Sequence, residues 1–142
     1  MAERHTGTCS CGAVSIEVIG PPLQMGYCHC ANCRRYSGAP FVAFALWKNE
    51  NLKVTSGNEF LGRYKSSDMT VRGFCRKCGT HLVNDHPSLD LVDVRPVILE
   101  DLGFKPAIHL NYEDTVLPIK DGLPKLKDFP ESVGGSDEIL PE

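Results

Sequence analysis

Short apolar stretches, separated by turn-forming residues, run along most of the chain. Residues 13–19 (AVSIEVI) alternate, so that Val14, Ile16 and Val18 fall on one face of a strand. Residues 41–47 (FVAFALW) are apolar at both alternating sets of positions, which predicts a strand buried on both faces. Thirteen glycines and ten prolines punctuate the chain between such stretches. The pattern predicts a mainly β domain built from several short strands.

Six further segments share this strand-like composition and end near Gly, Asn, Asp or Pro. They are NLKVTSG (51–57), EFLGRYKS (59–66), MTVRGFC (69–75), THLVND (80–85), DLVDVRPVIL (90–99) and PAIHLNY (106–112). Helical patterns are weak, and only CANCRRYSG (30–38) and ILEDLG (98–103) favour a turn or so of helix. We expect residues 1–130 to form a single domain and residues 131–142 to form a flexible C-terminal tail.

The charge distribution narrows the range of partners. The net charge is −3 and the pI is about 5.9, which argues against a general affinity for nucleic acid or an anionic membrane. From Glu113 onward the sequence contains eight acidic residues and three lysines, whereas the first 112 residues carry a net charge of +2. The longest apolar run is far too short to span a membrane, and the first 25 residues contain no apolar signal-peptide core. We therefore expect a cytoplasmic protein, whose seven cysteines stay reduced and serve as metal ligands or catalytic thiols.

Four of the cysteines occur in two similar short motifs. GTCSCGAVSI (7–16) and FCRKCGTHLV (74–83) each place two cysteines and a glycine before a strand. The glycine allows a positive φ, so that each tight turn aims two thiolates at one point. Two such knuckles predict a closed, structural zinc site formed by Cys9, Cys11, Cys75 and Cys78. The alternative is that these residues are buried free thiols or a redox pair.

The other three cysteines, Cys28, Cys30 and Cys33, lie within six positions of one another. A zinc ion with three protein ligands keeps one position open for water or substrate, and three thiolates leave it with a net charge of −1. Such a centre suits a further soft thiolate better than hydroxide, which points to a small thiol as substrate. Cys30 and Cys33 alone could instead form a redox dithiol.

A histidine could also complete a second structural site. His29 has ligand candidates on both sides and is expected to point away, whereas His5, His81, His86 and His109 stay open as fourth ligands. Arg34 and Arg35 could offset the negative charge or bind a substrate carboxylate, although one of the two is expected to be an ordinary surface charge.

Three motifs together carry a family resemblance. G-x-C-x-C-G-x-V (7–14), C-H-C-x-x-C-R-x-x-x-G (28–38) and F-C-x-x-C-G-T (74–80) resemble the glutathione-dependent formaldehyde-activating enzyme family, also called the GFA/CENP-V domain. The segment HLNYEDTVLPIKDGLPKL (109–126) is similar to the C-terminal segment of that family, so the resemblance runs from about Thr6 to Phe129. The family often has a tryptophan near residues 115–118, where this chain has Val116 and Leu117.

The resemblance implies an Mss4-like fold, with β-sheets folded around a structural zinc. It also implies two zinc ions per chain, with Cys9, Cys11, Cys75 and Cys78 as structural ligands and Cys28, Cys30 and Cys33 as catalytic ligands. The implied activity is that of a carbon–sulfur lyase, which joins glutathione and formaldehyde to give S-hydroxymethylglutathione.

Several roles stay open at the level of sequence. His29, Tyr36 and Arg34 are the neighbouring candidates for proton donor or oxyanion partner in such a reaction. The main alternative function is a non-catalytic, zinc-stabilised module that binds protein partners, because fold alone does not settle function. Zinc storage or thiol redox sensing is a third possibility. Neither the physiological thiol nor the oligomeric state follows from the sequence.

Overall fold

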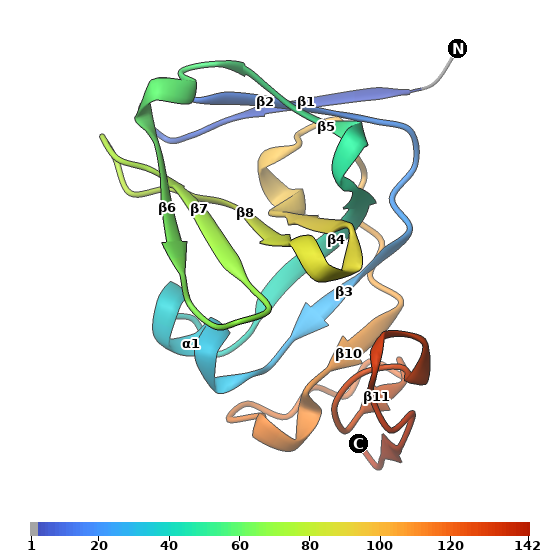
Figure 1. Cartoon of the computed structure of the whole chain (residues 1–142). Coiled ribbons are helices and arrows are strands. Elements are labelled where there is room, and N and C mark those ends of the chain that lie inside the picture. The colour runs from blue at the N-terminus through green and yellow to red at the C-terminus, as the bar shows by residue number, and fades with distance from the viewer. Residues whose placement is uncertain (1–2) are drawn as a thin grey trace. The chain divides into compact units, whose positions relative to one another are not determined.

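The structure is a computed structural model that describes residues 3–142, and the chain divides into two compact units. The first unit is formed by residues up to Gln24 together with Ala45–Phe104, and the second by Met25–Phe44 together with Lys105–Glu142. Both are built mainly from strands (Figure 1). This is the mainly β, Mss4-like architecture that the sequence predicts. Within residues 3–142, no helix is both long and apolar enough to cross a membrane.

The first unit contains two antiparallel arrays of strands. One array has the order β1-β2-β5, with bounds β1 (Arg4–Thr8), β2 (Ser15–Ile19) and β5 (Leu52–Ser56). In the other, the end of β4 pairs with β9, and β8, β7 and β6 follow. Their bounds are β4 (Val42–Lys48), β6 (Leu61–Lys65), β7 (Val71–Cys75), β8 (His81–His86) and β9 (Leu91–Val94). Short 3-10 turns connect them: η1 (Asn49–Asn51), η2 (Asn58–Phe60), η3 (Pro87–Leu89) and η4 (Pro96–Ile98).

The core of this unit follows the predicted pattern. Val14, Ile16 and Val18 are all buried, as their alternation predicts. Trp47 is also buried, and its indole Nε1 donates to the carbonyl oxygen of Gly20 at 2.9 Å. The helix expected at residues 98–103 is not formed. Leu99 instead makes a β-bridge with Gly7, and so short a segment gains too few hydrogen bonds to nucleate a helix against that pairing.

The second unit contains the strands of order β3-β10-β11-β12. β3 (Gln24–Cys28), β10 (Ile108–Leu110) and β11 (Lys125–Leu126) pair in parallel, and β12 (Ile139–Leu140) pairs antiparallel with β11. The predicted helix after the cysteines is present as α1 (Ala31–Ser37) and ends at Gly38 with φ 71°. Two 3-10 turns, η5 (Tyr112–Asp114) and η6 (Glu131–Val133), complete the unit.

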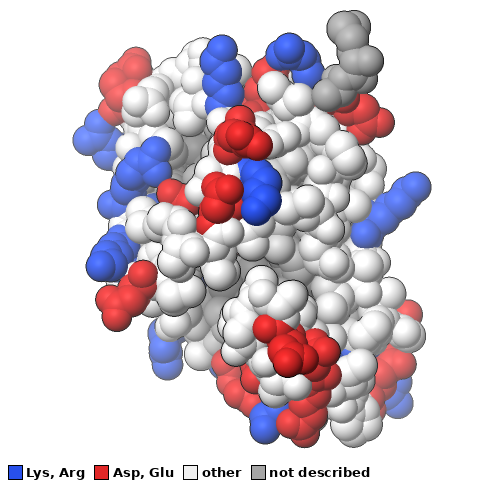
Figure 2. All heavy atoms as spheres, turned by 45° about the vertical axis from the view of Figure 1, so that its right-hand side comes forward, with Lys and Arg blue, Asp and Glu red and all other residues white. Residues whose placement is uncertain are grey.

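Residues 131–142, which the sequence predicts to be a flexible tail, contain η6 and β12. Their last residue, Glu142, lies 3.1 Å from the ammonium group of Lys125, a side chain that is fully buried. Acidic side chains gather on the surface that carries β11 and the C-terminus, as Figure 2 shows. The extent of a single domain over residues 1–130 stays a prediction.

Candidate functional site

The first cysteine cluster joins the two knuckles of the first unit. The Sγ atoms of Cys9, Cys11, Cys75 and Cys78 all lie within 4.8 Å of one another. The glycines that follow the knuckles, Gly12 and Gly79, have φ values of 79° and 82°, as the tight turns require. Cys9 and Cys75 are buried, whereas Cys11 and Cys78 are exposed.

Backbone and hydroxyl groups already point toward these sulfur atoms. The backbone N–H of Val14 donates to Cys9 Sγ at 3.2 Å, and that of Lys77 donates to Cys75 Sγ at 3.4 Å. The hydroxyl of Thr80 lies 3.1 Å from Cys78 Sγ, and this contact, together with backbone hydrogen bonds of Thr80 and Cys11, lowers the pKa of that thiol to about 5. Thr80 Oγ1 also accepts from the backbone N–H of Ser10, which ties one knuckle to the other. Four sulfur donors in this arrangement fit a closed tetrahedral metal site.

The second cysteine cluster lies at the start of α1 in the second unit. Cys28 ends β3, Cys30 is the N-cap residue of α1, and Cys33 is in its first turn. Their Sγ atoms lie within 4.8 Å of one another, and in the described part of the chain this group contains no histidine or carboxylate. Cys30 Sγ accepts the backbone N–H of Cys33 at 3.2 Å, so the helix cap itself holds the two thiols together.

The crowding of the three thiols has an electrostatic consequence. Hydrogen bonds with Cys30 and Cys33, together with burial, raise the pKa of Cys28 well above its usual range. The three thiols therefore do not all ionise without a positive charge beside them. A soft divalent cation supplies that charge, so both clusters could hold a metal ion and their donor atoms are compatible with zinc.

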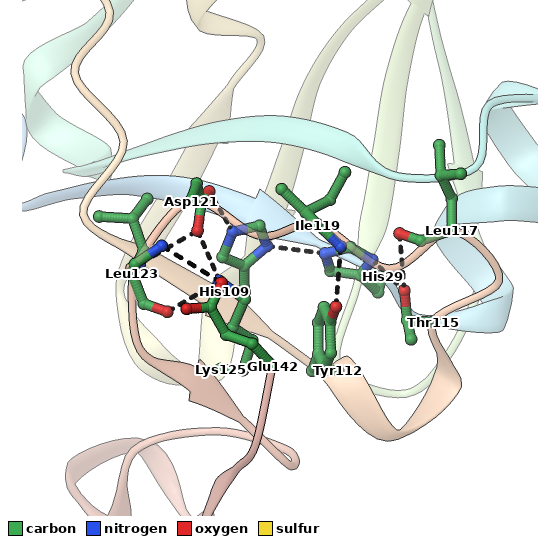
Figure 3. Close-up of polar contacts among 11 residues, drawn as sticks. His29, His109, Tyr112, Thr115, Leu117, Ile119, Asp121, Leu123, Lys125 and Glu142 are labelled. Atoms are coloured by element: carbon green, nitrogen blue, oxygen red, sulfur yellow. Dashed lines mark hydrogen bonds and ion pairs between the residues drawn. The ribbon is translucent and has the colours of Figure 1, made fainter.

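A polar chain, in which His29, His109 and Lys125 are fully buried, runs from the three-cysteine loop to the C-terminal segment (Figure 3). His29 Nδ1 lies 3.0 Å from Thr115 Oγ1, and His29 Nε2 lies 2.8 Å from His109 Nδ1. His109 Nε2 in turn lies 2.7 Å from Asp121 Oδ2. Lys125 Nζ then donates to Asp121 Oδ1 at 2.5 Å. His29 thus points away from the cysteines on either side of it, as expected.

The charges of this chain follow from its contacts. Burial raises the pKa of Asp121, but the hydrogen bonds from Lys125 and His109 outweigh burial and lower it below its usual range. Burial lowers the pKa of Lys125, yet Asp121 and Glu142 outweigh that effect and raise it. Burial, followed by the neighbouring His109, lowers the pKa of His29 to about 4. At neutral pH Asp121 and Lys125 are therefore charged and His29 is neutral.

The remaining predicted site residues have different surroundings. Arg35 is exposed, whereas Arg34 is half-buried and its Nε atom is buried with no hydrogen-bond partner in the part of the chain that the structure describes. Val116 and Leu117, at the position where the family often has tryptophan, are exposed. The open fourth-ligand candidates have other contacts: His5 meets Glu3, His81 meets Asn84, His86 meets Thr70, and His109 belongs to the polar chain.

The sequence reasoning missed several residues that contact the three-cysteine loop directly or through the polar chain. Asn111 Nδ2 donates to Cys28 Sγ at 3.4 Å, and Asp114 Oδ2 accepts the backbone N–H of Ala31 at 3.2 Å. Thr115 contacts His29, and Asp121 fixes the far end of the polar chain. All four follow β10, and the parallel pairing of β10 with β3 places the first three, Asn111, Asp114 and Thr115, beside residues 28–31. The polar run after the strand candidate at 106–112 was the signal that could have drawn attention to them.

The chain is similar to known proteins in sequence and in structure. Residues 4–114 match the family model described as glutathione-dependent formaldehyde-activating enzyme. An uncharacterized lyase of Schizosaccharomyces pombe is 36% identical over 78 residues, which cover 55% of each chain. A Colletotrichum graminicola protein, whose name assigns it provisionally as a glutathione-dependent formaldehyde-activating enzyme, is 30% identical over 94 residues, 61% of this chain and 49% of its own.

A solved structure of a Rhodobacter sphaeroides protein is similar to this one. It has 32% sequence identity and a TM-score of 0.57, and the match covers 71% of this chain and 97% of that one. The chain spans about half the length of the curated relatives that it matches. Since the family model covers most of the sequence and includes all seven cysteines, the chain belongs to the glutathione-dependent formaldehyde-activating enzyme family.

Proposed function

We propose that this protein is a carbon–sulfur lyase-type enzyme that acts on the adduct of a small thiol and an aldehyde. Glutathione and formaldehyde, which give S-hydroxymethylglutathione, are the favoured pair. The observation that carries the proposal is the cluster of Cys28, Cys30 and Cys33, which offers three thiols and, among residues 3–142, no fourth ligand. The family and the names of the relatives support the same chemistry.

Cys28, Cys30 and Cys33 would hold the catalytic zinc, and Cys9, Cys11, Cys75 and Cys78 would hold a structural one. A catalytic zinc at the three-cysteine site supplies a low pKa for a substrate thiol, so that the thiolate is available near neutral pH. This division of roles follows from ligand number, because a closed set of four thiolates leaves no position for substrate.

The reaction adds a thiol across a carbonyl group. A carbon–sulfur bond forms, the carbonyl π bond breaks, and the proton lost by the thiol ends on the oxygen as a hydroxyl group. The reverse direction releases thiol and aldehyde. A group that holds and returns one proton is therefore sufficient. The hydroxyl of Thr115 with neutral His29 behind it is the pair in the described chain that suits this role.

The negative charge of glutathione suggests a substrate-binding role for Arg34 or Arg35. Glutathione carries two carboxylates, and a guanidinium binds a carboxylate through paired hydrogen bonds. Arg34 is half-buried on α1, directly after Cys33, and its buried Nε has no hydrogen-bond partner among residues 3–142. Arg34 is therefore the better candidate to bind the thiol substrate, and Arg35 is the exposed residue of the pair.

Exchange NMR with ¹³C-formaldehyde and glutathione tests the proposal. The zinc-loaded protein should speed the exchange between free formaldehyde and S-hydroxymethylglutathione above the spontaneous rate, whereas Cys30→Ser should not. A protein that holds both zinc ions and leaves this rate unchanged would instead support a non-catalytic, zinc-stabilised module that binds protein partners.

A further inference from the structure

Asn111 has an uncommon backbone conformation beside the three-cysteine cluster. It follows β10 with φ 53° and ψ 39°, in the left-handed region, and its side-chain Nδ2 lies 3.4 Å from Cys28 Sγ. Asparagine is among the few residues with a Cβ that tolerate this region. Residues held in such conformations concentrate at functional sites, because the surroundings must enforce them.

The backbone around Asn111 is fixed on both sides. The N–H of His29 donates to the carbonyl oxygen of Leu110 at 3.0 Å, and the N–H of Asn111 donates to that of Asp128 at 2.9 Å. The carbonyl oxygen of Asn111 accepts from the N–H of Asp114 at 3.0 Å. The direction of the side-chain amide is therefore set by the β10 pairing, before any ligand binds.

When Cys28 is a metal-bound thiolate, the hydrogen bond runs only from the Asn111 amide to the Cys28 sulfur. A metal-bound thiolate has no proton and accepts hydrogen bonds only, whereas the amide nitrogen of asparagine donates two. Three thiolates on a divalent cation leave a net negative charge, and hydrogen bonds to charged acceptors are the stronger ones. A neutral donor stabilises this charge without competing for the metal.

We propose that Asn111 is a positioning residue of the three-cysteine centre, whose side-chain amide holds Cys28 as a metal-bound thiolate through an N–H···S hydrogen bond. This inference rests on the proposed role of Cys28, Cys30 and Cys33 as metal ligands. It extends the centre beyond its cysteines to a residue that directly follows β10, the strand that pairs with β3.

Two substitutions distinguish the effect of the side-chain amide from the effect of the backbone conformation at position 111. Asn111→Gly keeps the left-handed conformation and removes the donor. Asn111→Asp keeps the shape of the side chain but replaces the N–H donor with a negative oxygen. Removing a residue that hydrogen-bonds to a metal-binding side chain typically weakens metal affinity by about 10- to 100-fold. We expect about a 10-fold loss for Asn111→Gly and a larger loss for Asn111→Asp. Asn58→Asp, at an exposed position of the first unit, makes the same charge change as a control.

Cysteine alkylation in a series of zinc buffers, read for each cysteine by mass spectrometry, measures the effect at one centre. In both variants Cys28, Cys30 and Cys33 should need more free zinc for protection, while Cys9, Cys11, Cys75 and Cys78 keep their original midpoint. The cobalt-loaded three-cysteine centre should also change its sulfur-to-cobalt charge-transfer energy.

Two results would overturn the inference. One is an Asn111→Gly protein that protects Cys28 at the same free zinc concentration as the unchanged protein. The other is a loss of protection at all seven cysteines, which would make Asn111 a residue of general folding. Neither readout depends on catalysis. If the affinity shifts as expected but the unchanged protein leaves thiol–formaldehyde exchange at its spontaneous rate, the proposed function fails and the role of Asn111 stands.

Discussion

His29 Nε2 lies 2.8 Å from His109 Nδ1, and both rings are fully buried. Only one of these two nitrogens can donate. Ionised Asp121 accepts only, so His109 Nε2 carries a proton toward it. When His109 has a single ring proton, its Nδ1 accepts from His29 Nε2–H. His29 Nδ1 then accepts the hydroxyl proton of Thr115. The tautomer of the histidine next to Cys28 and Cys30 is thus set by a carboxylate far along the sequence.

Asp121→Asn should reverse this chain of hydrogen bonds. The asparagine Oδ1 can still accept from Lys125, while its Nδ2 donates to His109 Nε2. His109 then donates through Nδ1, and His29 donates through Nδ1 to Thr115, whose hydroxyl turns to the carbonyl oxygen of Leu117 at 3.2 Å. Imidazole ¹⁵N NMR distinguishes the two tautomers directly. Asp128 is not part of this series of hydrogen bonds, so Asp128→Asn should leave the spectra unchanged. Histidine tautomers that are the same in Asp121→Asn and in the unchanged protein would refute the assignment.

The buried state of His29 predicts a pH dependence of stability. Its pKa is about 4 in the folded protein against 6.5 ordinarily, so between these pH values the unfolded chain binds more protons. The free energy of unfolding should therefore fall as the pH drops from about 6.5 to about 4. Chemical denaturation at several pH values, in a fixed zinc buffer, should show a steeper fall for the unchanged protein than for His29→Gln. Parallel curves would show that His29 is protonated equally in both states.

The two cysteine clusters should respond differently to loss of one ligand. We expect two zinc ions per chain, and Cys30→Ser should lose one of them while the fold survives. Cys78→Ser should unfold or aggregate, because a structural zinc contributes about 10–16 kcal/mol of apparent binding free energy. That range overlaps the upper part of the net stability of an ordinary domain, which is about 5–15 kcal/mol. Metal analysis with circular dichroism measures both effects. If Cys30→Ser unfolds as completely as Cys78→Ser, the division into structural and open centres is wrong.

Gly26 holds β3 close to β10. It pairs with Ile108, and a Cβ atom at this position would lie 2.2 Å from the carbonyl oxygen of Ile108. Gly26→Ala should therefore destabilise the protein by about 3 kcal/mol. It should also weaken metal binding at Cys28, Cys30 and Cys33, since Asn111, which contacts Cys28, directly follows β10. Gly103→Ala, in open space at φ 68°, is the control that carries backbone strain alone. Equal metal affinities in the two variants would argue against this link between β10 and the centre.

The sequence predicted those parts of the molecule that depend on local pattern. Val14, Ile16 and Val18 alternate as a half-buried strand must, and the cysteines within each motif are closely spaced in the sequence. The strand β1 escaped prediction because its buried positions are His5 and Gly7, which carry no apolar signal. β3 escaped prediction because Gly26, which reads as a turn residue, serves a close backbone approach.

The partners of the cysteines could not be predicted for a different reason. Asn111 and Asp114 each lie 83 positions beyond their partners, Cys28 and Ala31, and Asp121 is linked to His29 by hydrogen bonds only through His109. Polar residues in a loop have no periodicity that identifies their contacts. Only the parallel pairing of β10 with β3 shows which of them reach the cysteines.

The central claim is that Cys28, Cys30 and Cys33 form an open metal centre that binds a substrate thiol. Zinc-edge X-ray absorption of the protein with two zinc ions, with and without glutathione, tests this claim most directly. One closed and one open centre give an average of about 3.5 sulfur ligands per zinc, and a bound thiol raises that average to about 4. We expect this rise in the unchanged protein and not in Cys30→Ser. An average that is unaffected by glutathione and related thiols would contradict the claim.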